Sequence, residues 1–421
     1  DVGATLFIVA TLYLVWECLA SPSAWRWLAA GTTMGLALVS KYAAITLLPI
    51  LGIILAGHVL FDGARGSPLR ARLRHAATGL ALVCLAAMSV IPAAYFFQGF
   101  APWWTGLRRF LALAAAGQAS FFLGQYSYEG WWSYFPVAFL VKTPIGTLGL
   151  IAASLVLTRA GAPLRRREAL VLFTPVAVVL AVAMHARTHI GLRHILAVYP
   201  FLFVLASRLV TVRLRPAWLT AALVTLALAG TALSTLRVAP HQLAYFNELV
   251  GGPEAGHRYL SDSNLDWGQD LEAVKTFMDE AGLPIIYLSY FGTAPPAYYG
   301  IRYQYVPGSW PLEWPLPPDL VPADLGRKIL VISLFNLQEV QTHQAQLFAW
   351  LRDRKPVARI GYSIRVYDLT GDLDALLELS EVYRKTGLTA MARAEARKIL
   401  TLDPANAAAR ALLDRSREPG S

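Results

Sequence analysis

The first 236 residues consist of long apolar runs separated by short basic segments. An apolar run of about 20 residues is long enough for a helix to cross the ~30 Å hydrocarbon core of a membrane. Residues 98–130 are too polar and aromatic to cross and are expected at the membrane interface. We expect about eight spans, at residues 2–20, 27–39, 43–61, 75–97, 136–158, 169–184, 195–211 and 218–236. The span at 136–158 is expected to be broken near its start by Lys142-Thr143-Pro144.

A polar triplet, Ser40-Lys41-Tyr42, interrupts the apolar stretch between residues 27 and 61. This stretch is too long for one helix, so the triplet predicts the end of a short span and places Lys41 at a membrane face. The alternative is a single tilted helix in which the Lys41 side chain reaches back to the interface.

Arginine clusters at residues 65–74, 159–167 and 213–215 set the expected orientation. With eight spans all three clusters fall on one side, which the positive-inside pattern identifies as cytoplasmic. Asp1, Lys41, residues 98–130 and 187–194, and everything after Arg237 are then expected outside the cytoplasm.

A basic segment joins two of the expected spans on the outer side. It contains two arginines and three histidines within ten residues: His185, Arg187, His189, Arg193 and His194. Ionisable groups at the mouth of membrane helices usually face a partner, a cavity or a ligand, and arginine binds phosphate through two parallel hydrogen bonds. The segment therefore predicts an anion site. The alternative is a basic loop held at the lipid head groups.

The overall composition, 56% hydrophobic and 15% charged over 421 residues, is that of a membrane protein. The net charge of +10 does not indicate nucleic-acid binding, because the arginines lie in short loops between apolar runs. Cys18 and Cys84 lie inside apolar runs, so no disulfide framework is indicated. The chain begins at Asp1 without a methionine, and we interpret it as a fragment with no visible signal peptide.

After Arg237 the composition becomes that of a soluble α/β domain, expected over residues 237–370. Strands are predicted at 257–262, 285–291, 328–335 and 360–368. Helices are predicted at 267–282, with Asp266 as cap, and at 341–355, and residues 295–322 form a Pro-rich excursion.

Residues 371–421 form the last expected segment, which resembles a tetratricopeptide repeat. The matching positions are Leu376, Leu379, Tyr383, Gly387, Ala392, Leu402, Asp403 and Pro404. One repeat cannot bury its own apolar face. We therefore expect a helical appendage or the first of several repeats.

Six short motifs carry a resemblance that covers about residues 1–292. They are Asp1-Val2-Gly3, Ser40-Lys41-Tyr42, GWWSYF at 130–135, Lys142-Thr143-Pro144, Gly191-Leu192-Arg193-His194, and DSNLDWGQD at 262–270. In order and spacing they resemble bacterial polyprenyl-phosphate-sugar-dependent glycosyltransferases of the type C fold. These enzymes are relatives of dolichyl-phosphate-mannose protein mannosyltransferases and of lipid A aminoarabinose transferases.

The resemblance implies an inverting sugar transfer at the outer membrane face. It makes Asp1 the catalytic carboxylate, the second of two in the family, and assigns the donor phosphate to Lys41, Arg193 and His194. The family's first carboxylate has no counterpart, so we expect the natural protein to extend by at least two N-terminal spans and this chain to be an inactive fragment. From its own chemistry, Asp1 is suited to bind a metal, orient an acceptor or accept a proton, or is a solvated chain end.

Further polar and aromatic residues are candidates for acceptor binding or for loop structure: Glu129, Trp131, Trp132, Lys142, Asp262 and Asp266. Asp262, Asn264 and Asp266 alternate as in a calcium loop, but the glycine and glutamate that should follow are out of place. Caps and turn hydrogen bonds are the alternative for these residues. No metal site is assigned, and the cofactor is left open between none and a divalent cation.

Taken together, the sequence predicts a polytopic α-helical membrane protein (residues 1–236) followed by an extracytoplasmic α/β domain and a tetratricopeptide-like tail. The expected partners are a polyprenyl-phosphate sugar donor, a protein, lipid or glycan acceptor, and the lipid bilayer, with no nucleic acid. The competing function is a membrane scaffold or transporter that binds a partner. A transporter is expected to carry midplane charges and internal repeats, which are not seen, and a scaffold does not need Arg193 and His194 outside.

Overall fold

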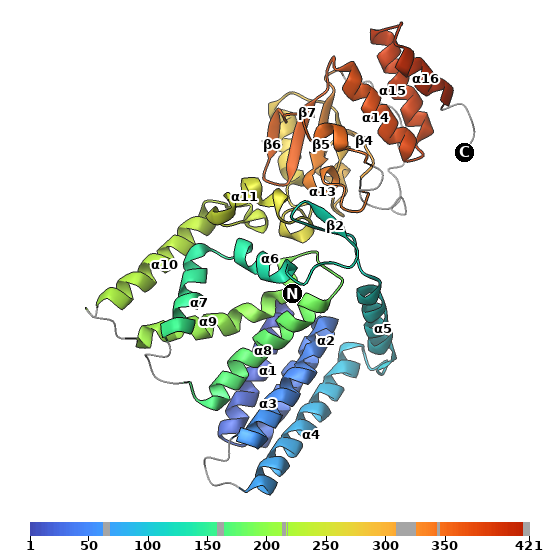
Figure 1. Cartoon of the computed structure of the whole chain (residues 1–421). Coiled ribbons are helices and arrows are strands. Elements are labelled where there is room, and N and C mark those ends of the chain that lie inside the picture. The colour runs from blue at the N-terminus through green and yellow to red at the C-terminus, as the bar shows by residue number, and fades with distance from the viewer. Residues whose placement is uncertain are drawn as a thin grey trace. The chain divides into compact units, whose positions relative to one another are not determined.

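The computed structural model describes residues 1–61, 68–157, 164–212, 216, 218–308, 326–342 and 346–415 (Figure 1). The chain divides into two compact units. The first comprises Asp1–Gln118, Tyr128–Arg237 and Asn247–Leu249, and the second comprises Ala119–Ser127, Val238–Phe246 and Val250–Ser421. Several expected features lie outside the described residues: Arg65, Arg159, Arg213, Arg215 and residues 309–325 of the Pro-rich excursion.

The first unit is helical. Its α-helices are α1 (Val2–Ala20), α2 (Ala24–Ser40), α3 (Leu47–Phe61), α4 (Leu69–Ala94), α5 (Ala101–Ala116), α6 (Tyr134–Lys142), α7 (Ile145–Leu157), α8 (Arg166–His185), α9 (Tyr199–Ser207) and α10 (Trp218–Leu236). Shorter 3-10 segments are η1 (Tyr42–Thr46), η3 (Leu192–Val198), η4 (Arg208–Thr211) and η6 (Glu248–Val250). The helix α5 falls within the stretch expected not to cross the membrane.

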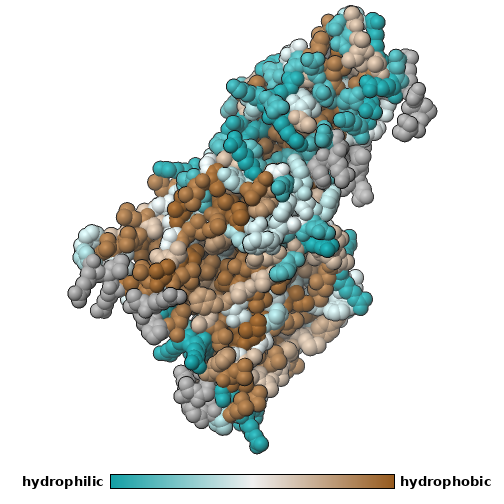
Figure 2. Space-filling model, viewed as in Figure 1, coloured by the Kyte–Doolittle hydropathy of each residue, from teal (hydrophilic) through white to brown (hydrophobic). Residues whose placement is uncertain are grey.

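Six helical segments among the described residues are long and apolar enough to cross a membrane, and a seventh is obtained if the bent pair α6 and α7 counts as one span. The six are Val2–Ala20, Tyr42–Phe61, Leu69–Ala94, Arg166–His185, Leu192–Thr211 and Trp218–Leu236. These helices indicate a multi-pass membrane protein, and Figure 2 shows the largely hydrophobic surface of this part of the chain. The expected eight spans are thus reduced to six or seven. One difference is α2, whose 17 residues make a helix only about 25 Å long. The other, when the count is six, is the bent pair α6 and α7.

Close packing joins α2 to its neighbours. It runs antiparallel to α1 across the turn at residues 21–23 and packs along α4 (Figure 1). Gly31 and Gly35, four residues apart, face α4 so closely that a Cβ on either would overlap α4 atoms at Val83 or Val90. Small residues at this spacing allow helices in a membrane to approach each other.

Two breaks in the helices occur where the sequence predicts them. Lys41 is in extended conformation between α2 and η1, so the interpretation of residues 27–61 as one tilted helix is wrong. The second break, after Lys142, turns α7 by 115° from α6. The buried side chain of Asn247 stabilises that break, because its Nδ2 donates to the carbonyls of Leu140 at 2.6 Å and Thr143 at 2.9 Å.

The second unit contains a five-stranded sheet in the order β4-β3-β5-β7-β6. Its strands are β3 (Ile286–Ser289), β4 (Tyr303–Tyr305), β5 (Ile329–Ser333), β6 (Ala358–Ile360) and β7 (Ile364–Asp368). The strands β4, β3 and β5 are parallel, whereas β7 pairs antiparallel with both β5 and β6. The amphipathic helix α12 (Leu271–Glu280) buries Leu271, Val274 and Met278 in a common core with β3, β5 and β7.

Smaller elements complete this unit. They are the hairpin β1 (Ser120–Phe122) and β2 (Gln125–Ser127), α11 (Gly252–Ala255), α13 (Leu334–Leu337), η5 (Gln242–Ala244), η7 (Gly256–Arg258), η8 (Asp262–Asn264), η9 (Pro296–Tyr299) and η10 (Ala349–Leu351). Although the hairpin lies far from the sheet in sequence, Phe122 forms a β-bridge with Leu260.

The strands expected near 285–291, 328–335 and 360–368 are confirmed by β3, β5 and β7. Two other predictions are wrong, and a third is confirmed only in part. Residues 257–262 form a 3-10 turn and a single bridge instead of a strand, and the described part of 341–355 holds only η10. The helix expected at 267 begins at Leu271, because Gly268 at φ +77° forms a turn and the Asp266 carboxylate accepts from the Gly268 N–H instead of capping the helix.

The tail forms α14 (Leu373–Lys385), α15 (Thr389–Leu402) and α16 (Ala407–Arg415). The fully buried carboxylate of Glu395 accepts from Tyr287 Oη at 2.8 Å and from Gln304 Nε2 at 2.6 Å, and pairs with Lys398 at 2.9 Å. Tyr383 donates to the carbonyl of Tyr305 at 2.7 Å. The tail is therefore attached to the sheet through buried hydrogen bonds on β3 and β4.

Candidate functional site

The carboxylate that precedes α1 lies beside the ammonium group that follows α2. Because α1 and α2 are antiparallel, the start of one and the end of the other lie at the same end of the unit. Lys41 Nζ donates to Asp1 Oδ1 in a short ion pair, and the two side chains are 25% and 27% exposed. The structure thus brings together two predicted site residues that are 40 positions apart.

The segment η3 brings Arg193 and His194 to this pair. It packs against α1 and α8, and Arg193 is its second residue. Burial and the positive charge of Arg193 lower the pKa of Lys41 to about 8. His194 interacts electrostatically with Lys41 and Arg193. All four residues assigned by resemblance to catalysis and donor binding are therefore neighbours.

A buried imidazole lies next to this cluster. The ring of His189, 2% exposed, contacts the rings of Tyr134 and Phe135 at centroid distances of 4.9 and 5.2 Å, and Trp131 at 6.5 Å. Gly130, at φ +77°, is required there, because a Cβ would overlap His189 Nδ1. Burial lowers the pKa of His189 to about 4, so the ring is neutral at physiological pH.

The GWWSYF motif therefore surrounds the histidine with aromatic rings. Neither His189 nitrogen has a hydrogen-bond partner among the described residues. Phe135 also contacts His194, at 6.2 Å, so the motif touches both histidines. The basic segment predicted His189 as part of an anion site, but its burial among aromatic rings had no signal in the sequence.

The other candidates of the first unit lie around this cluster in different ways. Trp131 contacts His189, whereas Trp132 is 71% exposed and Glu129 is exposed. Lys142 is the last residue of α6, at the break held by Asn247. Asn247 is a residue that sequence reasoning missed, since an isolated asparagine carries no signal of its distant partners.

Asp262 and Asp266 belong to the second unit, where both are buried in turns. Asp262, at φ +58°, accepts from the Ser263 N–H at 2.5 Å. Asp266 accepts from the backbone N–H groups of Gly268 at 3.1 Å and Phe335 at 3.5 Å, and burial raises its pKa to about 7. These contacts favour the turn interpretation over a calcium loop. Within the described ranges, no three His, Cys, Asp or Glu side chains are arranged to hold a metal ion.

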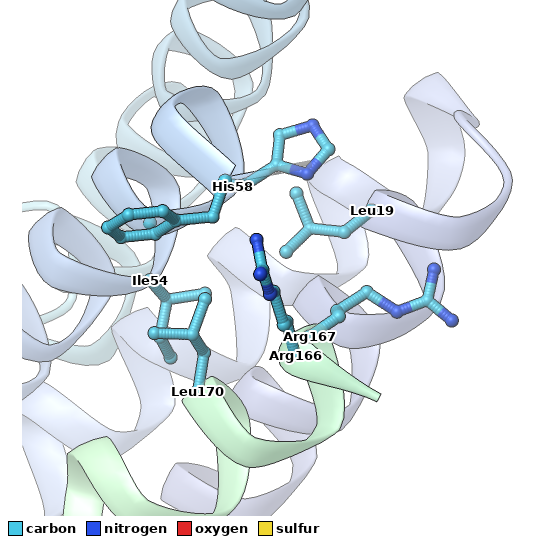
Figure 3. Close-up of a pocket in the computed structure, with 8 residues that line it drawn as sticks. Leu19, Ile54, His58, Arg166, Arg167 and Leu170 are labelled. Atoms are coloured by element: carbon cyan, nitrogen blue, oxygen red, sulfur yellow. The ribbon is translucent and has the colours of Figure 1, made fainter. Parts of the chain in front are cut away.

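A small pocket at the opposite end of the helices carries no ligand site. It is lined by Leu19, Ile54, Gly57, His58, Phe61, Arg166, Arg167 and Leu170 (Figure 3). Its volume is about 10 Å³, which is at most the space of one water molecule.

Comparison of the chain with protein-family models, curated proteins and solved structures finds no match. The site must therefore be interpreted from its own chemistry. Two cations, one carboxylate and two imidazoles meet at one end of apolar helices, an arrangement able to bind a phosphate and to accept a proton.

Proposed function

We propose that this chain belongs to a membrane glycosyltransferase that moves a sugar from a polyprenyl phosphate to an acceptor hydroxyl on the extracytoplasmic face, with inversion. The observation that carries the proposal is the cluster of Asp1, Lys41 and Arg193, contributed by three separate segments. The predicted helices alone are equally compatible with a transporter, but this cluster suits a phosphate leaving group.

In the proposed reaction the acceptor oxygen attacks the anomeric carbon from the face opposite the phosphate. The bond between that carbon and the phosphate oxygen breaks, and its electron pair leaves on the phosphate. Lys41 and Arg193 stabilise the added negative charge, which counts for most in a site with little water. The hydroxyl proton passes to a carboxylate, and we assign this role to Asp1, which lies beside Lys41.

The ion pair suggests how donor binding prepares this carboxylate. A carboxylate paired with an ammonium group is a weak base, because the positive charge favours its ionised form. A donor phosphate competes with Asp1 for Lys41. In the donor complex the Asp1 carboxylate is therefore released from the ion pair, with the His194 ring beside the cluster.

Binding of the carrier phosphate tests the proposal directly. The full chain in lipid nanodiscs is titrated with a short-chain polyprenyl phosphate, and binding is measured by displacement of a radiolabelled carrier. Arg193→Lys keeps the charge but loses the planar pair of donors, so we expect binding to weaken by about tenfold, or ~1.4 kcal/mol. Transfer from a labelled donor by the same samples measures turnover.

Arg187→Lys is the matched control, because Arg187 lies in the same basic segment and its side chain donates to the Ala115 carbonyl at 3.4 Å. We expect this variant to bind as the parent does. Equal losses from Arg187→Lys and Arg193→Lys would show a general charge effect and refute a phosphate site at Arg193.

A further inference from the structure

A groove with a volume of about 470 Å³ lies among α1, α8 and α9 of the first unit. One face of each helix contributes side chains, at intervals of three or four residues along α1 and α9. The lining residues are Val9, Tyr13, Trp16, Leu164, Glu168, Val171, Leu172, Pro200, Phe201, Val204, Ser207 and Arg208.

Most of this lining is apolar and belongs to segments long and apolar enough to span a membrane. Val204, on α9, is 54% exposed. An apolar groove on a membrane helix is filled by hydrocarbon and excludes water. A spanning helix, about 10 Å wide and 30 Å long, occupies roughly 2,400 Å³, far more than the groove, so a narrower chain fits it better.

The polar residues of the groove gather at one end. Glu168 is in the first turn of α8, Arg208 follows α9, and Trp16 is in the last turns of α1. This is the opposite end of α1 from Asp1. The Arg167 guanidinium carbon lies 5.3 Å from the centroid of the Trp16 ring, which adds a second cation beside the groove.

Two carboxylates at this end are already engaged by arginines, and one of them is Glu17 on α1, whose Oε2 lies 3.5 Å from Arg26 Nη1. The other is Glu168 on α8. Glu168 Oε2 accepts from the Arg165 backbone N–H at 3.0 Å, and its Oε1 lies 3.9 Å from Arg165 Nε. Arg165 balances the charge of Glu168 and Arg26 that of Glu17, so Arg167, over the Trp16 ring, and Arg208, in the lining, add positive charge. The end of the groove is positively charged, and the arginine-rich ends of membrane helices lie at the head-group layer.

We propose that this groove binds one anionic glycerophospholipid, with an acyl chain along α1 and α9 and the phosphate at Arg208 and Arg167. Basic pockets between membrane helices recognise anionic lipid head groups in this way. The site is separate from the Asp1 cluster, and its existence does not depend on the proposed transfer reaction.

Native mass spectrometry of the full chain tests the proposal. The protein is incubated with equal amounts of phosphatidylglycerol and phosphatidylcholine that have identical acyl chains, and the retained lipids are counted. We expect a preference for phosphatidylglycerol that is lost in Arg208→Gln. Val204→Trp fills the groove and should reduce retention of both lipids, with Val9→Phe as an independent filling variant if Val204→Trp is not monodisperse.

Arg74→Gln is the control, because Arg74 is an exposed arginine of α4 near the same end and does not line the groove. It should retain lipid as the parent does. The proposal is overturned if the parent retains both lipids equally, or if Arg74→Gln loses the preference for phosphatidylglycerol as fully as Arg208→Gln does. Displacement of the lipid by excess inorganic phosphate would also overturn it. Lipid counts unchanged in both filling variants would equally rule out an acyl chain in the groove.

Discussion

The buried carboxyl of Asp266 makes the stability of the α/β domain depend on pH. Its side chain lies 1% exposed in the turn before α12, and burial raises its pKa from 3.8 to about 7. Between these values the folded domain binds more protons than the unfolded chain, so the free energy of unfolding falls as pH rises and levels off above pH 7. From pH 5 to pH 8 this one carboxyl lowers the free energy of unfolding by about 3 kcal/mol.

Asp266→Asn should remove this dependence. The amide oxygen can still accept from the Gly268 N–H. The amide nitrogen stands where the second carboxylate oxygen accepted from the Phe335 N–H at 3.5 Å, so that weak hydrogen bond is lost. Loss of that contact costs about 1 kcal/mol at every pH. The stability of the variant relative to the parent should therefore rise by about 3 kcal/mol between pH 5 and pH 8.

Hydrogen exchange of the β5 amides in the full chain, corrected for the intrinsic exchange rate at each pH, measures this free energy locally. Asp279→Asn is the control, since the Asp279 side chain is 65% exposed and pairs with Lys275 on the surface of α12. It should follow the parent at every pH. Parallel pH profiles for Asp266→Asn and the parent would refute the burial argument.

Three further predictions follow from the described contacts. Val357 is 63% exposed, so a cysteine there (Val357→Cys) should react with an impermeant thiol reagent in intact cells. Cys84→Ser in the same protein removes an exposed native thiol. Reaction only after lysis would place the domain in the cytoplasm. Gly130→Ala forces a Cβ into His189, so the free energy of unfolding should fall by ~1–3 kcal/mol and the thermal midpoint should fall with it. An unchanged midpoint would show that the loop relaxes. Asn247→Ala leaves the carbonyls of the α6–α7 break without their donor, at a cost of about 1–3 kcal/mol measurable by the same melt, and full stability would show that water replaces the amide.

The sequence alone determined the features that depend on local pattern. Apolar runs located the membrane helices, because a span must bury about 20 consecutive apolar residues in lipid. The polar triplet located the first break because a charged residue such as Lys41 is placed at a membrane face, not inside a span. Pro144 located the second because proline lacks the backbone N–H that a continuous helix needs. The pairing of Asp1 with Lys41 could also be anticipated, because two helices joined by a short turn must be antiparallel.

Only the tertiary structure decided what depends on distant partners. His189 appeared in the sequence as one of three basic-segment histidines, and its burial comes from rings more than 50 residues away. Asn247 supports a helix break about 100 residues earlier, and Asp266 turned from an expected helix cap into a buried acceptor because Phe335 donates to it from beyond β5. Hydrogen bonds and ring contacts of this kind leave no periodic trace along the chain, since they need proximity in space and not in sequence.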